Sequence, residues 1–169
     1  FLALLALALV PAFLERQESA LERELAVFSL ARPIFPEIQL VHSREMMRIE
    51  QYVNSGDSSF IALYQDDLIR EGQLLNDLRR VISGMPLTYR VELSQVESQA
   101  NDWRVLHSPL MEAGPLSTDP MAFRENMEDD RARYDSVQVA VQAFEDRLIR
   151  DASLAASRLQ RRRTWQLWV

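Results

Sequence analysis

The sequence has 169 residues and no cysteine, carries a formal net charge of −6, and is 47% hydrophobic and 26% charged. This length and composition are typical of one folded domain, and the lack of cysteine excludes disulfides, zinc–thiolate sites and cysteine nucleophiles. The acidic balance argues against a nucleic-acid partner, which would normally require a basic face. Four glycines and seven prolines provide few turn signals, so we expect a small number of long elements.

The first segment, Phe1 to Leu14, contains no charge and only Pro11 outside the strongly apolar set. As a helix it would cover about 21 Å, against a hydrocarbon core of about 30 Å. A signal peptide would need a basic region before this segment and a small-residue cleavage pattern after it. We interpret residues 1–14 as the outer part of a truncated transmembrane helix, with a buried terminal helix as the alternative.

Four helical stretches are predicted beyond this segment. The first runs to about residue 54, and we expect a kink or short break at Pro33 and Pro36, because a proline inside a helix costs about 3 kcal/mol. The run Asn54–Asp57 predicts a stop and a restart. Gly56 suits the left-handed position after a helix, and Asp57 or the following serine suits the cap of the next one.

The second helix is expected over residues 57–82 and the third over residues 86–112, each with an apolar stripe at helical spacing. We interpret Gly72, which lies on the first stripe, as a point of close helix approach. A Gly- and Pro-containing loop is predicted over residues 113–120. The two stripes are Ile61, Tyr64, Leu68, Leu75, Leu78 and Ile82, then Tyr89, Leu93, Val96, Ala100, Trp103 and Leu110.

The last helix begins near Asp119 and continues to the end of the sequence, a length of about 70 Å at 1.5 Å per residue. No segment shows sustained period-two alternation, so strands are not expected. We predict an all-α fold: an elongated antiparallel up-down-up-down four-helix bundle with long first and fourth helices. The bundle would cover residues 15–163, and residues 164–169 would start a second transmembrane helix.

Two segments resemble the CHASE3 family of extracytoplasmic sensor domains. At the first helical turn-around, Ser55-Gly56-Asp57, Phe60 and Tyr64 match the family pattern at the right spacing. In the last helix, Tyr134-Asp135-Ser136-Val137, followed by Phe144-Glu145 and Leu148, resembles the family's fourth helix. The resemblance covers roughly residues 25 to 163.

The resemblance implies a periplasmic or extracellular sensory input domain of a transmembrane signalling receptor. Its cytoplasmic output module would be a histidine kinase or a diguanylate cyclase. Such domains are not themselves enzymes, carry no cofactor, and are expected to form homodimers anchored in the inner membrane through both ends. The signal would be an unidentified small molecule or protein. The alternatives are a chemoreceptor-type ligand-binding bundle and a membrane-anchored scaffold or partner-binding bundle.

Few residues suggest chemistry. His42 and Glu45, one turn apart, could begin a metal site, but bundle metal sites draw ligands from several helices, and we interpret His42 as a surface histidine. The other histidine is His107. The acid pairs Asp66-Asp67 and Asp129-Asp130 point about 100° apart on a helix, which favours solvated faces over catalysis. No phosphate-binding loop or nucleophile motif occurs, so neither an enzyme nor a metal site is expected.

If a ligand binds inside the bundle, the candidate residues are Arg48, Tyr64 and Trp103. The simpler interpretation is that the two aromatic residues pack in the core with their polar atoms at its rim. Arginine and tryptophan near the end of the sequence are expected to lie at a membrane interface, in contact with lipid phosphates and the interfacial belt. The predicted interface residues are Arg161, Arg162, Arg163, Trp165 and Trp168. The opposite orientation, with a cytoplasmic bundle, stays open.

Overall fold

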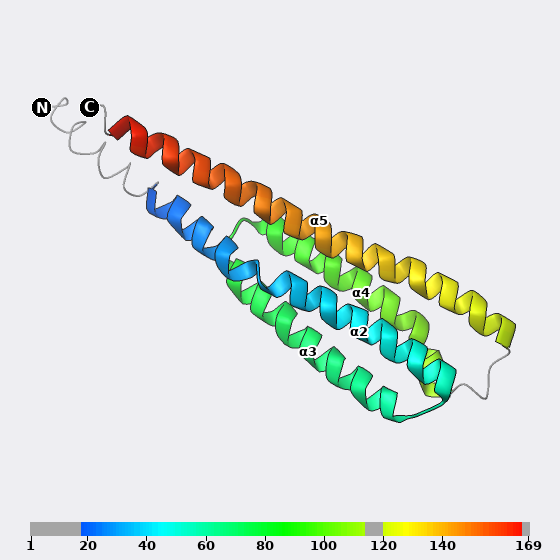
Figure 1. Cartoon of the computed structure of the whole chain (residues 1–169). Helices are drawn as coiled ribbons and strands as arrows, with labels where there is room; N and C mark the ends of the chain where they lie inside the picture. Colours follow the sequence, from blue (N-terminus) through cyan, green and yellow to red (C-terminus); the bar gives the residue numbers. More distant parts are fainter. Residues whose placement is uncertain (1–17, 114–119, 167–169) are drawn as a thin grey trace, which may run out of the picture. The chain divides into compact units, whose positions relative to one another are not determined.

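The computed structural model describes residues 18–113 and 120–166. All the elements in these ranges are helices, and no strand occurs among the described residues. The predicted all-α class is therefore confirmed. The chain divides into two compact units, of which Ala31–Glu145 forms one, and Phe1–Leu30 together with Asp146–Val169 forms the other. Figure 1 shows the helices with their labels.

A proline pair separates the first two helices. One helix covers residues 18–31, residues 32 and 33 form a turn, and α2 covers Ile34–Ser55. Pro33 precedes α2 with a φ of −70°, which is the angle that its ring imposes. Pro36 lies in the first turn of α2, where backbone N–H groups have no partner within the helix, so its missing N–H removes no hydrogen bond. The predicted break is confirmed.

The turn between α2 and α3 has the predicted chemistry. Gly56 adopts φ 71° and ψ 7°, a left-handed conformation that glycine reaches without steric penalty. Its N–H donates to the Tyr52 carbonyl at 2.7 Å. Asp57 Oδ1 then accepts a hydrogen bond from the N–H of Ser59 at 2.9 Å, and this bond lowers the pKa of the exposed Asp57 carboxyl. Asp57 therefore caps α3, which begins at Ser59.

The second and third predicted helices are present with small changes at their ends. α3 covers Ser59–Val81, a short 3-10 turn covers Ile82–Gly84, and α4 covers Leu87–Ala113. Met85 between them is extended, with φ −83° and ψ 164°, as the residue before a proline prefers. The predicted loop over 113–120 falls almost entirely on residues 114–119, which lie outside the described residues.

The last helix is continuous, as predicted. α5 covers Pro120–Gln166, a length of 47 residues, or about 70 Å. It begins with a proline, which is well tolerated at a first helical position because its N–H would have no partner there. No glycine or proline follows within the helix. Its residues up to Glu145 belong to the unit Ala31–Glu145, and those from Asp146 onward belong to the other unit.

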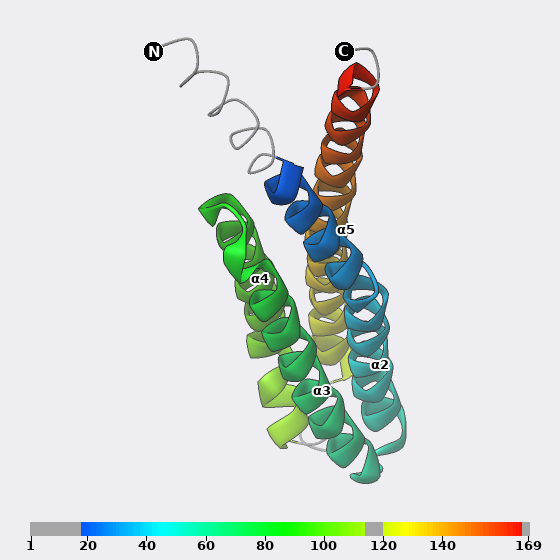
Figure 2. The same ribbon diagram turned by 90° about the vertical axis from the view of Figure 1, so that its left-hand side faces the viewer.

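The unit Ala31–Glu145 has a large core. Within it, α2, α3, α4 and the first part of α5 lie side by side (Figures 1 and 2). The predicted stripes supply much of this core. A Cβ added at Gly72 would meet no atom within 4 Å, so our interpretation of this glycine as a point of close helix approach was wrong. The largest fully buried apolar side chains are Phe35, Ile38, Val41, Ile49, Leu78, Ile82, Leu93 and Trp103.

The other unit buries fewer apolar side chains among its described residues. They are Phe28 from the helix over 18–31 and Leu148, Ala155 and Leu159 from α5. These α5 positions recur at spacings of seven and four, which places them on one helical face. On the surface of α5, Arg147 Nε and Asp151 Oδ2 form an i, i+4 ion pair at 3.6 Å. Pairs of this kind contribute a few tenths of a kcal/mol.

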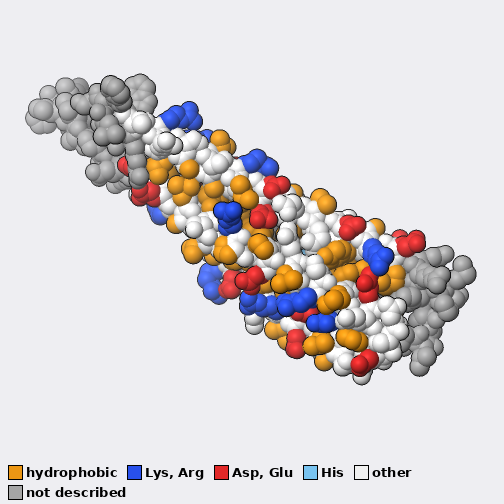
Figure 3. Space-filling view, viewed as in Figure 1, with side chains coloured by type: hydrophobic (Ala, Val, Ile, Leu, Met, Phe, Trp, Pro, Cys, Tyr) orange, Lys and Arg blue, Asp and Glu red, His pale blue; other side chains and the backbone are white. Residues whose placement is uncertain are grey.

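Charged and hydrophobic side chains are interspersed on the face shown in Figure 3. Exposed pairs such as Arg70 with Glu37, 2.5 Å apart, and Arg79 with Glu97, also 2.5 Å, contribute at most about 1 kcal/mol each. Among the described residues, no helix combines the length and apolar character that a membrane span requires. The predicted transmembrane segment 1–14 lies outside these residues, as do residues 167–169 of the second predicted segment.

Candidate functional site

Among the described residues of the unit Ala31–Glu145, six charged or polar side chains are buried. They come from all four of its helices. Buried ionisable groups are rare unless they are paired or serve a function, because burial disfavours the charged form. Together with Tyr64, Trp103 and Arg104, which contact them, they form what we call the polar core cluster. The six residues are His42, Glu45, Asp67, Glu71, His107 and Asp130.

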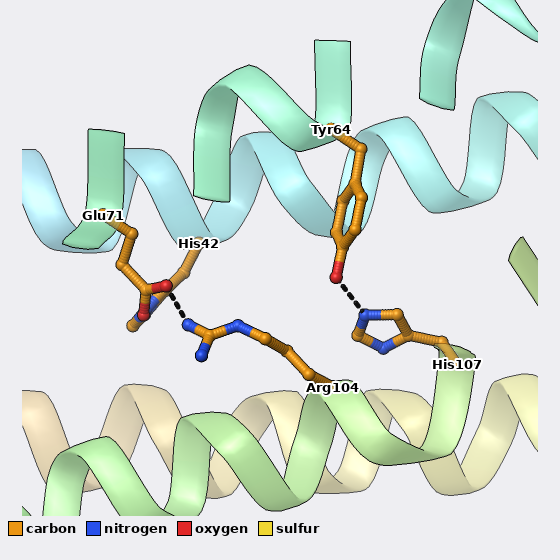
Figure 4. Close-up of polar contacts among 5 residues, drawn as sticks. All are labelled: His42, Tyr64, Glu71, Arg104 and His107. Atoms are coloured by element: carbon orange, nitrogen blue, oxygen red, sulfur yellow. Dashed lines mark hydrogen bonds and ion pairs between the residues drawn. The ribbon is translucent and has the colours of Figure 1, made fainter. Parts of the chain in front are cut away.

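Glu71 of α3 links three helices. Its Oε1 lies 2.6 Å from His42 Nε2 of α2, and its Oε2 pairs with Arg104 Nη2 of α4. Figure 4 shows the three side chains converging. The Glu71 side chain is 3% exposed and that of Arg104 is 24% exposed. A buried carboxylate needs such partners, because losing them would leave an uncompensated charge in the core.

His42 is neutral at physiological pH in this environment. Burial, and after it the nearby positive charge of Arg104, lowers its pKa from 6.5 to about 4. The contact with Glu71 is therefore a hydrogen bond that the neutral ring donates from Nε2, and the charge of Glu71 is balanced by Arg104. His42 Nδ1 is left as a buried acceptor without a hydrogen bond among the described residues. His42 was expected on the surface, and this prediction was wrong.

A second set of hydrogen bonds joins α3, α4 and α5. The Tyr64 hydroxyl lies 2.7 Å from His107 Nε2, as Figure 4 shows, and His107 Nδ1 lies 3.1 Å from Asp130 Oδ1. With the Tyr64 O–H donating to Nε2, the ring is left to donate from Nδ1 to the carboxylate. Burial, followed by the charge of Glu45, raises the pKa of the Tyr64 hydroxyl, so the hydroxyl stays protonated and can donate.

Glu45 of α2 differs from the other buried carboxyl groups. It has no exposed surface, and neither of its carboxyl oxygens makes a hydrogen bond among the described residues. Burial raises its pKa from 4.5 to about 7; the charge of Arg104 opposes this shift, and that of Asp67 adds to it. The proton is therefore gained or lost near neutral pH.

Trp103 of α4 lies among the rings of the cluster. Its centroid is 5.0 Å from that of His107, 5.4 Å from that of Tyr134 and 6.1 Å from that of His42. All three contacts are edge-on, the arrangement that aromatic quadrupoles prefer. The side chain is fully buried, and its Nε1–H has no hydrogen-bond acceptor among the described residues.

Two of the three candidate ligand residues from the sequence, Tyr64 and Trp103, belong to the cluster. Their polar atoms lie inside the core, so the expectation that they would lie at its rim was wrong. Arg48 is half-buried at the margin, with its Nε 3.8 Å from Asp67 Oδ2. Arg44 Nε approaches the other oxygen of Asp67 at 3.2 Å. The structure thus makes Arg48 a partner of a buried carboxylate.

Sequence reasoning missed most of the acidic members. Asp67 and Asp130 are the buried halves of the two acid pairs that were interpreted as solvated. Glu71 was not singled out at all. The available signal was their position: Glu71 follows Tyr64 by seven residues and precedes Leu75 by four, which places a carboxyl on an apolar stripe.

The remaining predicted residues lie near the end of α5. Arg161 is exposed, and its Nε donates to the carbonyl of Ser157 at 3.4 Å. The side chains of Arg162, Arg163 and Trp165, and the whole of Trp168, fall outside the described residues. The structure therefore does not test their assignment to a membrane interface.

Metal binding was not expected from the sequence. Among the described residues, no group of three or more His, Asp or Glu side chains is placed to hold a metal ion. His42 and Glu45, which could have begun such a site, are both present in the cluster without a third ligand.

Comparisons of the chain with family models, curated proteins and solved structures found no match. The resemblance to the CHASE3 family therefore stays a prediction.

Proposed function

We propose that the chain is a sensory input domain of a transmembrane signalling receptor. In this proposal the four helices of the bundle run up-down-up-down, and the domain faces the periplasm or cell exterior. One observation carries it: α5 places Asp130 in the polar core cluster and continues as a single helix to Gln166. A change in the cluster therefore acts directly on a helix that extends far beyond it.

The mechanism is a displacement of α5 relative to the helices that contact it. Packed helices change between discrete arrangements and do not deform continuously. Hydrogen bonds of the cluster connect α2 to α3, α3 to α4, and α4 to α5. A signal that binds one pattern of these bonds more tightly than another would shift the equilibrium between the helix arrangements. The size of the shift is set by the difference between its binding free energies for the two arrangements. The residues nearest such a signal would be Tyr64 and Trp103.

Membrane attachment is the second part of the proposal. The segment Phe1 to Leu14 is uncharged, and the segment Arg161–Val169 combines three consecutive arginines with two tryptophans. Tryptophan prefers the membrane–water interface, and arginine binds lipid phosphates. We propose that both segments contact the inner membrane and that the receptor is a homodimer with a cytoplasmic output module, most simply a histidine kinase.

The absence of cysteine from the sequence allows a direct test of orientation. Ser58 is exposed in the turn before α3, so Ser58→Cys supplies a single thiol there. A membrane-impermeant maleimide should label this variant in intact cells after permeabilisation of the outer membrane alone. Labelling that requires rupture of the inner membrane would overturn the proposed location. The parent without this substitution is the control for background labelling.

A second test concerns helix displacement. The side chains of Gln39 of α2 and Gln142 of α5 share a hydrogen bond of 3.2 Å. A short, reducible crosslinker between the thiols of Gln39→Cys and Gln142→Cys should fix α2 against α5. In the full-length receptor we expect the crosslinked double variant to lose the response of its output activity to the signal, and reduction to restore it. An unchanged response after complete crosslinking would contradict the mechanism, and each single variant is a matched control.

A further inference from the structure

The isolation of Glu45 among buried carboxyl groups that have charged or hydrogen-bonding partners points to a further property. Glu71 has His42 and Arg104 as partners, Asp67 has Arg44 and Arg48, and Asp130 has His107. Glu45 is fully buried, and both of its oxygens lack a hydrogen bond among the described residues. An ionised carboxylate in this position would be uncompensated, and such charges are strongly unfavourable in a core.

Charged and titratable groups surround Glu45 on every helix of the unit. Arg104 stabilises its ionised form, and Asp67 opposes it. Glu45 in turn acts on Tyr64. The groups of the cluster and its margin are His42, Arg44 and Arg48 on α2, Tyr64, Asp67 and Glu71 on α3, Arg104 and His107 on α4, and Asp130 and Tyr134 on α5.

Arg104 is the cation that Glu45 and Glu71 can share. It gives Nη2 to Glu71, while its Nε is buried without a hydrogen bond among the described residues. A guanidinium has five N–H donors in a planar fork and can serve two carboxylates from different edges. The free Nε–H therefore provides a place for a second carboxylate, and Glu45 is the one whose oxygens are both unused.

The protonated form of Glu45 has a different possible partner from the ionised form, and this partner, His42, lies on the same helix. Neutral His42 donates from Nε2 to Glu71, so its Nδ1 carries an unused lone pair. His42 precedes Glu45 by three residues on α2, a spacing at which helical side chains are neighbours. The protonated Glu45 carboxyl has one O–H donor, and His42 Nδ1 can accept a hydrogen bond from it.

We propose that Glu45 is a proton-operated switch inside the bundle. When it is protonated, Arg104 stays on Glu71. When it is ionised, it draws the guanidinium toward itself and weakens the bond between α3 and α4. This switch is a property of the packed core and does not depend on the sensory role proposed above. Only the further step, that protons are an input signal of the receptor, rests on that role.

The raised pKa of Glu45, about 7, places the change near neutral pH. The low pKa of His42, about 4, keeps the neighbouring ring neutral throughout. His107, bonded to Tyr64 and Asp130, is the other imidazole of the cluster. A test must therefore separate the Glu45 carboxyl from this imidazole.

Carbon NMR of the glutamate carboxyl groups makes that separation. The full chain, labelled with ¹³C at the glutamate carboxyl, is titrated from about pH 6 to about pH 9, above the range in which ordinary glutamates titrate. We expect one carboxyl signal to move in this range and to vanish from the spectrum of Glu45→Gln. The variant Glu128→Gln, at an exposed position of α5, is the matched control and should keep the moving signal.

The response of the cluster is measured in the same titration. In a background of Trp165→Phe and Trp168→Phe, fluorescence reports Trp103 alone, and the ¹⁵N signal of Arg104 Nε reports its partner. Both should change with the midpoint of the carboxyl signal, and both changes should be absent in Glu45→Gln. Wild-type data decide the matter if that variant fails to fold. A spectrum with no glutamate carboxyl titrating above about pH 6, or an Arg104 signal that does not follow it, overturns the switch.

These outcomes are independent of the proposed receptor function. The titration uses purified protein, so the switch can be established even if the chain proves to face the cytoplasm or to be a scaffold. Conversely, correct orientation in the Ser58→Cys labelling combined with no titrating carboxyl would leave the receptor proposal standing and remove the switch. If both hold, the output activity of the full-length receptor should follow pH in the parent and lose that dependence in Glu45→Gln.

Discussion

Two parts of the same core are stabilised in different ways. At one level of the unit Ala31–Glu145, Phe35 of α2 packs edge-on against Phe144 of α5 with ring centroids 5.5 Å apart. At another, α2 contributes His42 and Glu45 to the polar core cluster. The apolar level depends on area and shape, and neither changes with pH. The polar level depends on ion pairs and hydrogen bonds between particular groups, so it is sensitive to substitutions and protons that leave the apolar level unchanged.

Among the predicted substitutions, Arg104→Met in the polar level should cause the largest loss of stability. This change leaves the Glu71 carboxylate buried without its cation, and removing one partner of a buried ion pair costs about 3–5 kcal/mol. Urea unfolding of the purified protein measures the loss. Adding Glu71→Met should recover most of it, because two apolar side chains can replace a buried pair at little cost. A double variant no more stable than Arg104→Met would contradict the pairing.

Glu45→Gln tests the pH dependence of the polar level. The folded-state pKa of Glu45 is about 7 against 4.5 without burial. The folded protein therefore holds this proton more tightly, and its contribution to stability is complete below pH 4.5 and is lost as pH rises through about 7. At 1.36 kcal/mol per pKa unit, the free energy of unfolding of the parent should fall by about 3 kcal/mol relative to Glu45→Gln across this window.

The apolar level supplies the control for this measurement. Leu78, which is 1% exposed in α3, carries no titratable group. Leu78→Ala should destabilise the protein by about 2–5 kcal/mol, with the same loss at every pH at which the parent is folded. If the loss for Leu78→Ala follows pH as steeply as the effect of Glu45→Gln, the pH dependence would not belong to the polar level.

His42→Gln should show the opposite slope. The folded-state pKa of His42 is about 4 against 6.5 without burial, so its contribution to stability is present above pH 6.5 and is lost as pH falls through about 4. The parent should therefore lose up to about 3 kcal/mol relative to His42→Gln over this fall. Thermal unfolding at a series of pH values measures it. Equal slopes in parent and variant would show that the ring is not buried as a neutral group.

In the parent these two dependences oppose each other. Between pH 4.5 and 6.5 the folded state keeps the proton on Glu45 and off His42, while the unfolded chain does the reverse. The number of bound protons is the same in both states, so this pair contributes no slope to stability in that range. Each single variant should reveal a slope that the parent conceals.

The smallest expected effect lies outside both levels, at the cap of α3. Asp57→Ala removes the acceptor for the Ser59 N–H and should cause the small loss of stability that is typical of a removed helix cap. Circular dichroism during thermal unfolding measures this change. The conservative variant Asp57→Asn keeps an acceptor and should retain most of the stability. A loss as large as that of Arg104→Met would mean that the turn has a role beyond capping.

The sequence predicted the helices well because their ends depend on local chemistry. Gly56, Asp57 and Pro33 act within a few residues of themselves, and all three do what the sequence predicts. The stripe of α4 predicted from periodicity is buried from Tyr89 to Trp103. The division into two units was not foreseen, because it depends on which distant residues pack together.

The candidate site was predicted only in part. Tyr64 and Trp103 were found because aromatic residues on a stripe are expected in a core. The carboxyl groups were missed because acidic residues are normally exposed, and a sequence does not show which arginine from another helix will reach them. Arg104 comes from 33 residues beyond Glu71. The proper signal, an acidic residue at a stripe position, would have marked Glu71, and the same test marks Asp130, four residues before Tyr134.

The His107 ring has a consequence for motion. It accepts from Tyr64 on one edge and donates to Asp130 on the other, so a flip of the ring would replace both nitrogens with carbons and break both bonds. The two hydrogen bonds restrict the rotamers of all three side chains at once, so one side chain gains freedom only when the others do. We therefore expect side-chain order in Tyr64, His107 and Asp130 to rise and fall as one quantity, although they belong to three different helices.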